Sequence, residues 1–279
     1  MIRYFIIICL TFGCISVIQA QKKEKIKGNR NVTTKETIVD AFHKISLTDK
    51  FKIDIIEGIT SKVFIEADDN LHDVIKISVI DSVLRFDTTK KITSSKAMHI
   101  KVTYSDALRY IEVQDNAEVS SLTSINLPEM TVSNSGNSKS FLNIKTDKFK
   151  YINSDKSLVK LNLEAKIVTL ELSENASLEA LINADSMQVD MYQRAEAKIE
   201  GDVLSLDIRA DNSSSFIGKN LTAQTCNAVA GLQTEMYLQV NKALTIDASG
   251  NTEIFIYDEP KLTVNNFSGT AKLHKKEMK

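Results

Sequence analysis

Apolar residues recur at a nearly constant interval through the last two thirds of the chain. One apolar column contains Val132, Tyr151, Leu170, Val189 and Ile208, and a second column after a turn contains Val159, Leu178, Ala197 and Phe216, with the same spacing in both. Around these positions apolar and polar residues alternate, as they do in half-buried strands. Each unit of about 19 residues therefore contains two short strands with an apolar inner face, joined by a tight corner.

The corners repeat with the same period. A small residue follows a turn-like residue in nine pairs, which run from Asn116-Ala117 to Gly269-Thr270 at steps close to one period. A sustained period near 20 is typical of stacked structural units that cannot bury their apolar faces alone. The prediction is an all-β chain that forms a parallel β-solenoid with about 19-residue rungs, in which like strands pair at about 4.8 Å. An antiparallel β-sandwich is the alternative, and the near-constant step favours the solenoid.

The N-terminal third has strand signals without this period. Short alternating runs at residues 51–55, 63–67, 75–79, 83–86 and 98–104 are separated by turn residues. We expect residues 38–105 to form an N-terminal β-hairpin capping subdomain that shields the first open edge of the solenoid. The solenoid repeats are then expected at residues 106–274. The flanking segments are a polar linker at residues 21–37 and a basic tail at residues 275–279, whose lysines would protect the far edge.

The segment from Met1 to Ala20 has the features of a signal peptide. Arg3 precedes an apolar run, and cleavage after Ala20 fits the small-residue rule. Lipidation at Cys14 is the competing interpretation. After cleavage no transmembrane segment is expected, and the protein would be exported to the periplasm or to the outer-membrane or cell surface. Only Cys226 would remain, so no intramolecular disulfide can form. The repeat aligns Cys226 with Leu244, an inward position, which predicts a buried thiol.

Charge and motifs narrow the classes of function. The 35 basic and 36 acidic residues leave a formal net charge of −1, which does not favour a nucleic-acid partner. The four histidines are scattered, and no metal-binding, phosphate-binding or nucleophile motif is present, so neither a cofactor nor a metal site is expected. The densest oxygen cluster, Asp68-Asp69-Asn70, is interpreted as a turn after a strand, with a calcium site as the alternative.

Two outward-facing columns could carry function. Glu171, Asp190 and Arg209 occupy equivalent positions in successive units, and two carboxylates with an arginine on such a face are an arrangement known from polyuronate lyases. The alternative is an exposed charge ladder of little energetic weight. The other column begins charged at Lys160, Glu179 and Lys198, and ends with the candidate contact residues Ile217, Tyr237 and Phe255, followed by Tyr257. These residues could contact a surface glycan, an envelope protein or another copy of the chain. The alternative is an ordinary aromatic ladder or a face covered by the tail.

Several segments resemble a known family. Phe42-His-Lys-Ile-Ser-Leu, then Phe51-Lys-Ile-Asp-Ile-Ile-Glu-Gly58 and Val63-Phe-Ile-Glu-Ala-Asp-Asp-Asn70, are similar to the entry of the GIN-type head domain of auto-transporter adhesins. Val83-Leu-Arg-Phe86 and Leu108-Arg-Tyr-Ile-Glu-Val113 continue the resemblance, which covers about residues 38–274. It implies a secreted β-solenoid of gram-negative bacteria and brings no catalytic or binding residues. The family often has Gly at the rung corner, where this chain has Lys156, Arg194 and Ser213.

Together these observations predict a secreted, non-enzymatic β-solenoid binding module of the cell envelope with an adhesin-like role. One alternative is a carbohydrate-active β-helix that uses Glu171, Asp190 and Arg209. The other is a structural envelope protein that associates with itself. The sequence identifies no ligand.

Overall fold

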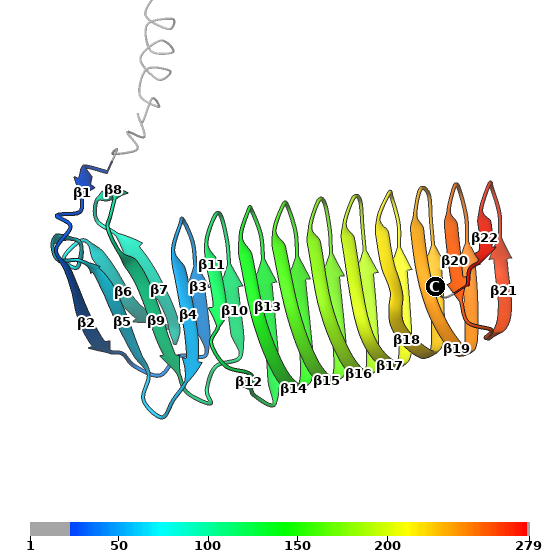
Figure 1. Ribbon diagram of the computed structural model, residues 1–279, viewed down its shortest axis with the longest axis horizontal. Coiled ribbons are helices and arrows are strands. Elements are labelled where there is room, and N and C mark those ends of the chain that lie inside the picture. The colour runs from blue at the N-terminus through cyan, green and yellow to red at the C-terminus, as the bar shows by residue number, and fades with distance from the viewer. Residues whose placement is uncertain (1–22, 278–279) are drawn as a thin grey trace, which may run out of the picture.

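The protein is a long all-β rod, and its computed structural model describes residues 23–277 (Figure 1). Parallel strands stack along the rod as successive rungs, so the predicted parallel β-solenoid is confirmed. The strands of the first third are β1 Lys25–Lys27, β2 Val32–Ile38, β3 Lys44–Leu47, β4 Lys52–Glu57, β5 Lys62–Asp68, β6 Ile75–Ile80, β7 Val83–Thr88, β8 Lys91–Ser94 and β9 Met98–Tyr104. The rungs that follow use β10 Tyr110–Val113, β11 Glu118–Ser121, β12 Ile125–Asn126, β13 Glu129–Asn134, β14 Lys139–Asn153, β15 Leu158–Leu172, β16 Ser177–Met191, β17 Glu196–Ala210, β18 Ser215–Ala230, β19 Glu235–Ala248, β20 Glu253–Tyr257, β21 Lys261–Phe267 and β22 Lys272–Lys275.

The two predicted apolar columns form the core. Tyr151 pairs with Leu170 and Leu170 with Val189, and all three side chains are fully buried. Phe216, in the second column, is also fully buried. Each of the strands β14 to β17 bends in its middle, so one continuous strand supplies the second half of one rung and the first half of the next. Each inward side chain is therefore buried between the equivalent side chains of the rungs before and after it.

Tight turns close one side of every rung. In the turn at residues 154–157, the backbone N–H of Ser157 donates to the carbonyl of Ser154 at 3.3 Å, and Asp155 has φ 61°. Glycine or a polar residue usually takes this left-handed position, and glycines 136, 250 and 269 do so here. We expected the corner glycine position at Lys156, Arg194 and Ser213. The left-handed residue comes one position earlier in each of these turns, and Ser213 has a positive φ as well. The fourth turn residue is Ala, Ser or Thr from the second rung on, whereas the larger Phe51 occupies this position in the turn at residues 48–51.

The solenoid begins earlier than the predicted boundary at residue 106. Strand β3 pairs in parallel with β10, and β4 pairs in parallel with β11, so residues 44–57 form the first rung. Lys44 lies opposite Tyr110, although their separation in the sequence is several times the period of the later rungs. The chain between these rungs folds back as antiparallel hairpins that cover the first rung.

Those hairpins extend both sides of the first rung into a small sandwich. On one side β3 is followed by β7 and β6, and on the other β4 is followed by β9, β5 and β2. A short 3₁₀ helix, Asp69–Leu71, follows β5, and its Leu71 is fully buried in the core. The predicted polar linker at residues 21–37 is wrong for its described part, because β1 pairs with β8 and β2 pairs with β5. Edge strands tolerate the polar composition that suggested a linker.

The C-terminal end finishes with an incomplete rung made by β21 and β22. Lys275, expected in a basic tail, is the last residue of β22. Cys226 pairs with Leu244, as the repeat predicted, and burial raises the pKa of its thiol well above the usual range. The predicted signal peptide, including Cys14, lies outside the described residues. Within residues 23–277, no helix is long and apolar enough to cross a membrane.

Candidate functional site

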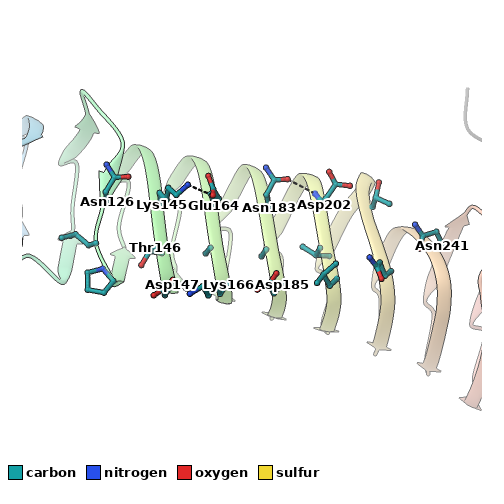
Figure 2. A pocket seen from close by; sticks show the side chains of 18 residues that line it. Asn126, Lys145, Thr146, Asp147, Glu164, Lys166, Asn183, Asp185, Asp202 and Asn241 are labelled. Atoms are coloured by element: carbon teal, nitrogen blue, oxygen red, sulfur yellow. Dashed lines mark hydrogen bonds and ion pairs between the residues drawn. The ribbon is translucent and has the colours of Figure 1, made fainter.

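A groove of about 800 Å³ lies on the side of the rod opposite the tight turns (Figure 2). It lies where β14 to β17 bend, and the ladder pairing skips one residue in each of these strands at the bend. Eighteen residues line it, from Asn126 in β12 to Asn241 in β19. Because successive rungs contribute equivalent positions, the groove is linear and follows the long axis of the rod.

Small and apolar side chains form the floor of the groove. Thr146, Ala165, Ala184 and Val203 occupy equivalent positions in successive rungs, and Leu204 adds a side chain that is 49% exposed. Alanine at two of these positions keeps the floor low. A shallow apolar floor of this kind suits the flat face of a sugar ring or an extended backbone.

Polar side chains form a row on each side of the floor. One row contains Asn126, Lys145, Glu164, Asn183 and Asp202, and the other contains Asp147, Lys166 and Asp185 before Leu204 (Figure 2). Parallel pairing sets the spacing along each row at the strand separation of about 4.8 Å. The rows therefore offer hydrogen-bonding groups at a regular interval along the rod.

The two halves of the groove differ in whether their charged side chains have ion-pair partners. In the first half, Lys145 pairs with Glu164 at 2.6 Å and Lys166 pairs with Asp147 at 2.8 Å. In the second half, the carboxylates of Asp185 and Asp202 have no hydrogen-bond or ion-pair partner among the described residues. Four carboxylates against two lysines give the groove a net negative charge. Its second half therefore has free acceptors for the hydroxyl or N–H groups of a ligand.

The predicted aromatic contact column exists, but it is partly covered. Ile217, Tyr237 and Phe255 pair in successive rungs, as expected. The Tyr237 and Phe255 rings stack at 4.6 Å, and His274 stacks on the other face of Phe255 at 4.7 Å. Phe255 is consequently only 8% exposed, so its interpretation as a freely exposed contact residue is wrong. The last rung, through His274 of β22, therefore covers the Phe255 end of this column.

Tyr237 and Tyr257 stay partly exposed beside this stack. The Tyr237 hydroxyl donates to Glu235 Oε1 at 2.6 Å, and this bond to a carboxylate raises the pKa of Tyr237 to about 12. The hydroxyl is therefore already used inside the protein.

The charged column is arranged as a surface ladder. Glu171 pairs with Asp190, and Asp190 with Arg209, in successive rungs. The Glu171 carboxylate, however, forms an ion pair with Lys150 at 2.8 Å, and Asp190 accepts a hydrogen bond from Gln188 at 2.8 Å. Both carboxylates have local partners on an exposed face and do not converge on a cavity. This geometry favours the interpretation as a charge ladder over a lyase site.

The Asp68-Asp69-Asn70 cluster holds the chain together near its N-terminal end. The buried Asp68 carboxylate accepts hydrogen bonds from the backbone N–H groups of Arg30, Lys96 and Ala97 at 2.9, 2.9 and 3.2 Å. Asn70 bonds the backbone of Asn29 and Lys27. These bonds join distant segments, so the cluster does more than close a local turn. No group of three or more potential metal ligands occurs within residues 23–277.

Sequence reasoning missed the groove. A signal was present, because the small residues Thr146, Ala165 and Ala184 recur once in each repeat between two polar columns. Inward columns elsewhere contain larger residues that fill the core. A column of small residues next to polar ladders could therefore have indicated a concave corner.

Comparison with known proteins supports the fold and the family. The family described as "Putative auto-transporter adhesin, head GIN domain" matches residues 41–181 and 152–260. No curated protein is detectably similar to this chain in sequence.

Solved structures from two bacterial species share the fold. A "putative adhesin" from Parabacteroides merdae has 16% identity and a TM-score of 0.64 over 91% of this chain and 99% of its own. A "putative adhesin" from Parabacteroides distasonis has 18% identity and a TM-score of 0.64 over 91% of this chain and 100% of its own. A "Putative lipid binding protein" from P. distasonis has 16% identity, a TM-score of 0.60 and the same coverage. The family match extends over most of the chain, and the protein therefore belongs to the family of the auto-transporter adhesin head GIN domain.

Proposed function

We propose that the protein is an exported, non-enzymatic, adhesin-like module that holds an extended glycan along the corner groove. The observation that carries this proposal is the pair of polar rows, spaced at the strand separation, on both sides of a low apolar floor. A chain of sugar rings has a repeat of similar length, so consecutive rungs can contact consecutive rings. The ring faces would lie on Ala184, Val203 and Leu204, and the hydroxyls would donate to the flanking rows.

The charge of the groove narrows the class of glycan. Asp185 and Asp202 carry unpartnered carboxylates, and the two groove lysines are already paired with acids. An anionic polymer such as a polyuronate would be repelled. A neutral polysaccharide, or one that carries amino groups, fits better because its donors match the free acceptors. This preference separates the proposal from the lyase alternative, whose substrate is anionic.

Binding to a panel of neutral, amino-bearing and anionic polysaccharides tests the proposal. The groove variant Asp185→Ala/Asp202→Ala removes one acceptor from each row. We expect affinity for the bound neutral or amino glycan to fall at least about tenfold, since each lost contact contributes on the order of 1 kcal/mol. The matched control is Gln188→Ala/Asp190→Ala, which changes an exposed and a half-buried position of β16 that do not line the groove.

Three results would contradict the proposal. They are no binding to any neutral or amino glycan, preferential binding of polyuronates, and a loss of affinity in the control equal to that in the groove variant. Circular dichroism of both variants checks that the strands are intact. A product with an unsaturated sugar end would instead establish a lyase.

Export is the second part of the proposal. Membership of a family described as auto-transporter adhesins, together with the apolar N-terminal run that begins after Arg3, supports it. Protease treatment of intact cells, followed by a blot of envelope fractions, tests where the protein lies. Cleavage from outside supports a surface role. Protection in intact cells and cleavage after the outer membrane is opened would place it in the periplasm and contradict adhesion.

A further inference from the structure

The last rung leaves part of the solenoid core uncovered. Leu262 and Val264 of β21 pair with Leu244 and Ile246 of β19 and continue their inward-facing columns. Leu244 and Ile246 are fully buried, whereas Leu262 is 43% exposed and Val264 is 44% exposed. Phe267, opposite the buried Ala248, is also 43% exposed. These three side chains therefore form an apolar end face that is close to half exposed.

The same rung has open backbone edges. Strand β21 pairs only with β19, and β22 pairs only with β20, among the described residues. Each strand therefore has one edge whose N–H and C=O groups lack a ladder partner. An open strand edge beside an exposed apolar face is a surface for strand pairing.

We propose that two copies of the protein join tail to tail through this end face. A suitable partner must supply two strand edges, one on each side of the rod, with apolar side chains between them. The opposite end also has open strand edges, at β6 and β2, but its core residue Leu71 is fully buried, so it lacks the exposed apolar core columns that the C-terminal end has. The C-terminal end of a second copy has two open strand edges at the same separation, with the same apolar side chains between them. The resulting contact is two-fold symmetric, so it closes with two copies and does not form a fibre.

The charges at the end face are compatible with self-association. The last turn and rung contain Lys261, Lys272, Lys275 and Lys276 together with Asp258, Glu259 and Glu277. Lys272 is already paired with Glu253 at 2.8 Å. A face with both signs can form cross-pairs with its own copy, whereas the single excess positive charge among these residues gives only a weak attraction to an anionic lipid surface. Lipid would also leave the open backbone edges without hydrogen-bond partners.

Two features limit the strength of the contact. The pairing of β21 with β19 has a bulge at Asn265, and lysines lie along both terminal strands. Bulges and edge lysines weaken strand pairing between molecules. Association is therefore expected to depend on protein concentration. Such a dimer would have a groove on each half, which doubles the contacts that it can make with one polymer.

Sedimentation velocity of residues 21–279 over a wide concentration range tests the proposal. The wild type is expected to change from monomer to dimer as its concentration rises. Val264→Lys places a charge in the centre of the end face and is expected to raise the dimer dissociation constant at least about tenfold. The matched control is Ile59→Lys, because Ile59 is fully exposed near the other end of the rod and its change should leave the dimer intact.

Several outcomes would overturn the proposal. These are a wild type that stays monomeric throughout, a dimer that survives Val264→Lys, and a dimer that Ile59→Lys abolishes to the same extent. Co-sedimentation with phosphatidylglycerol vesicles is the remaining measurement. Binding to vesicles that Val264→Lys removes, without a wild-type dimer, would assign the end face to lipid. The circular dichroism of each variant checks its fold, and none of these results depends on glycan binding in the groove.

Discussion

At the N-terminal end of the rod, antiparallel hairpins cover the first rung, whereas at the C-terminal end the last rung is left with an apolar face and two open strand edges. The difference is visible in single side chains. Leu71, in the short 3₁₀ helix of the N-terminal sandwich, is fully buried, and Leu262, in the last rung, is 43% exposed. Leu71 belongs to the buried core, whereas Leu262 continues a core column at its open end and pairs with Leu244 on one side only.

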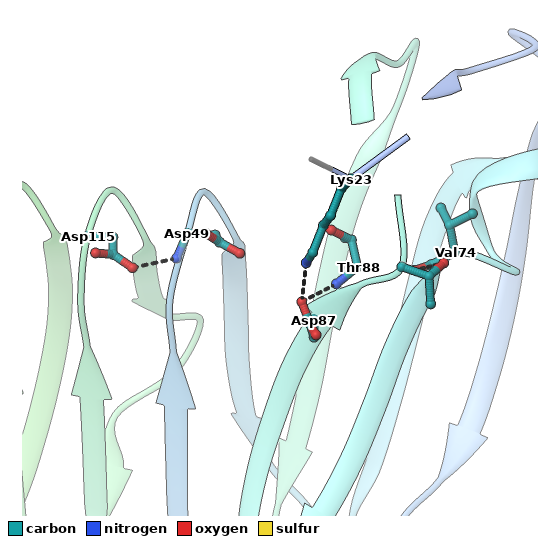
Figure 3. A network of polar contacts seen from close by, with 7 residues as sticks. Lys23, Asp49, Val74, Asp87, Thr88 and Asp115 are labelled. Carbon is teal, nitrogen blue, oxygen red and sulfur yellow. Dashed lines mark hydrogen bonds and ion pairs between the residues drawn. The ribbon is translucent and has the colours of Figure 1, made fainter. Parts of the chain in front are cut away.

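Polar contacts also join separate segments at the closed end. Figure 3 shows Lys23 paired with Asp87 at 2.8 Å and the backbone N–H of Asp49 donating to Asp115 at 3.0 Å, which links the turns of the first two rungs. Asp68 adds its three backbone bonds nearby. In a repeat protein, stability is close to a sum of repeats and their interfaces, so a rung with one interface opens more easily. We therefore infer that unfolding of a single copy begins at the C-terminal end.

The largest expected effect comes from comparing the same substitution at the two ends. Leu71→Ala should lower the free energy of unfolding by about 3 kcal/mol, because it leaves a cavity in a closed site. Leu262→Ala should lower it by less than about 1 kcal/mol, since much of that side chain is already in water. Chemical denaturation of both variants, followed by circular dichroism at low protein concentration, provides the measurement.

Leu244→Ala is the control for this pair. Leu244 lies in the same column as Leu262, one rung further in, and is fully buried. Leu244→Ala should lower the free energy of unfolding as much as Leu71→Ala does. Equal losses for Leu244→Ala and Leu262→Ala in the monomer would mean that the last rung is covered and that the two ends do not differ.

The regular rungs could be predicted because residues that are neighbours in space are separated by one repeat in the sequence. Tyr151 and Leu170 are separated by one period and pack in adjacent rungs, so the column was visible in the sequence. The first rung was missed because its hairpins are inserted between Lys44 and Tyr110 and remove the period. No local pattern reports a parallel pairing across an insertion of that length.

The candidate sites were less predictable, for a different physical reason. The register that aligns Ile217, Tyr237 and Phe255 followed from the period and is confirmed. Exposure did not follow from it, because the stacking of His274 on Phe255 depends on the last rung, whose repeat is weak. The groove depends on a bend within continuous strands such as β15, and alternation of apolar and polar residues says little about curvature. Register can be predicted here, whereas coverage and concavity need coordinates.

The second prediction concerns acid stability at the closed end. Burial acts to raise the pKa of Asp68, but hydrogen bonds from the backbone N–H groups of Arg30, Ala97 and Lys96 act against it, and the pKa lies below its ordinary value of 3.8. The ionised form is therefore favoured by folding. Its contribution is complete above about pH 4 and is lost as the pH falls below 3.8 through the lower folded value.

Asp68→Asn tests this expectation. The variant should melt at a lower temperature than the wild type at pH 7. This difference in melting temperature, the gap, should narrow as the pH falls from 4 towards 2.5. Thermal melts followed by circular dichroism across this range measure the gap. An equivalent substitution at the exposed Asp69 is the control, because that carboxylate accepts only a long bond from Thr33. A gap at Asp68 that is constant with pH would contradict the role of its charge.

The smallest expected effects lie in the tight turns, where the two halves of the rod also differ. In an early turn Asp155 takes φ 61°, and its carboxylate accepts a 2.7 Å bond from the backbone N–H of Gly136. In a late turn Leu232 takes φ 55° with a side chain that is 55% exposed. A left-handed backbone costs an ordinary residue on the order of 1–2 kcal/mol, and only Asp155 has a hydrogen bond that offsets this cost.

Leu232→Gly should therefore stabilise the protein by about 0.5–1 kcal/mol, because glycine adopts positive φ freely and little buried apolar surface is lost. Asp155→Gly relieves the same backbone cost but removes the bond to Gly136, so its net effect should be close to zero. Denaturant midpoints of the two variants and the wild type, measured together, are sensitive enough for differences of this size. Equal stabilisation by both changes would show that the Asp155 bond contributes nothing. Destabilisation by Leu232→Gly would mean that the Leu232 side chain is covered, as it would be if a partner packed on the turns near the open end.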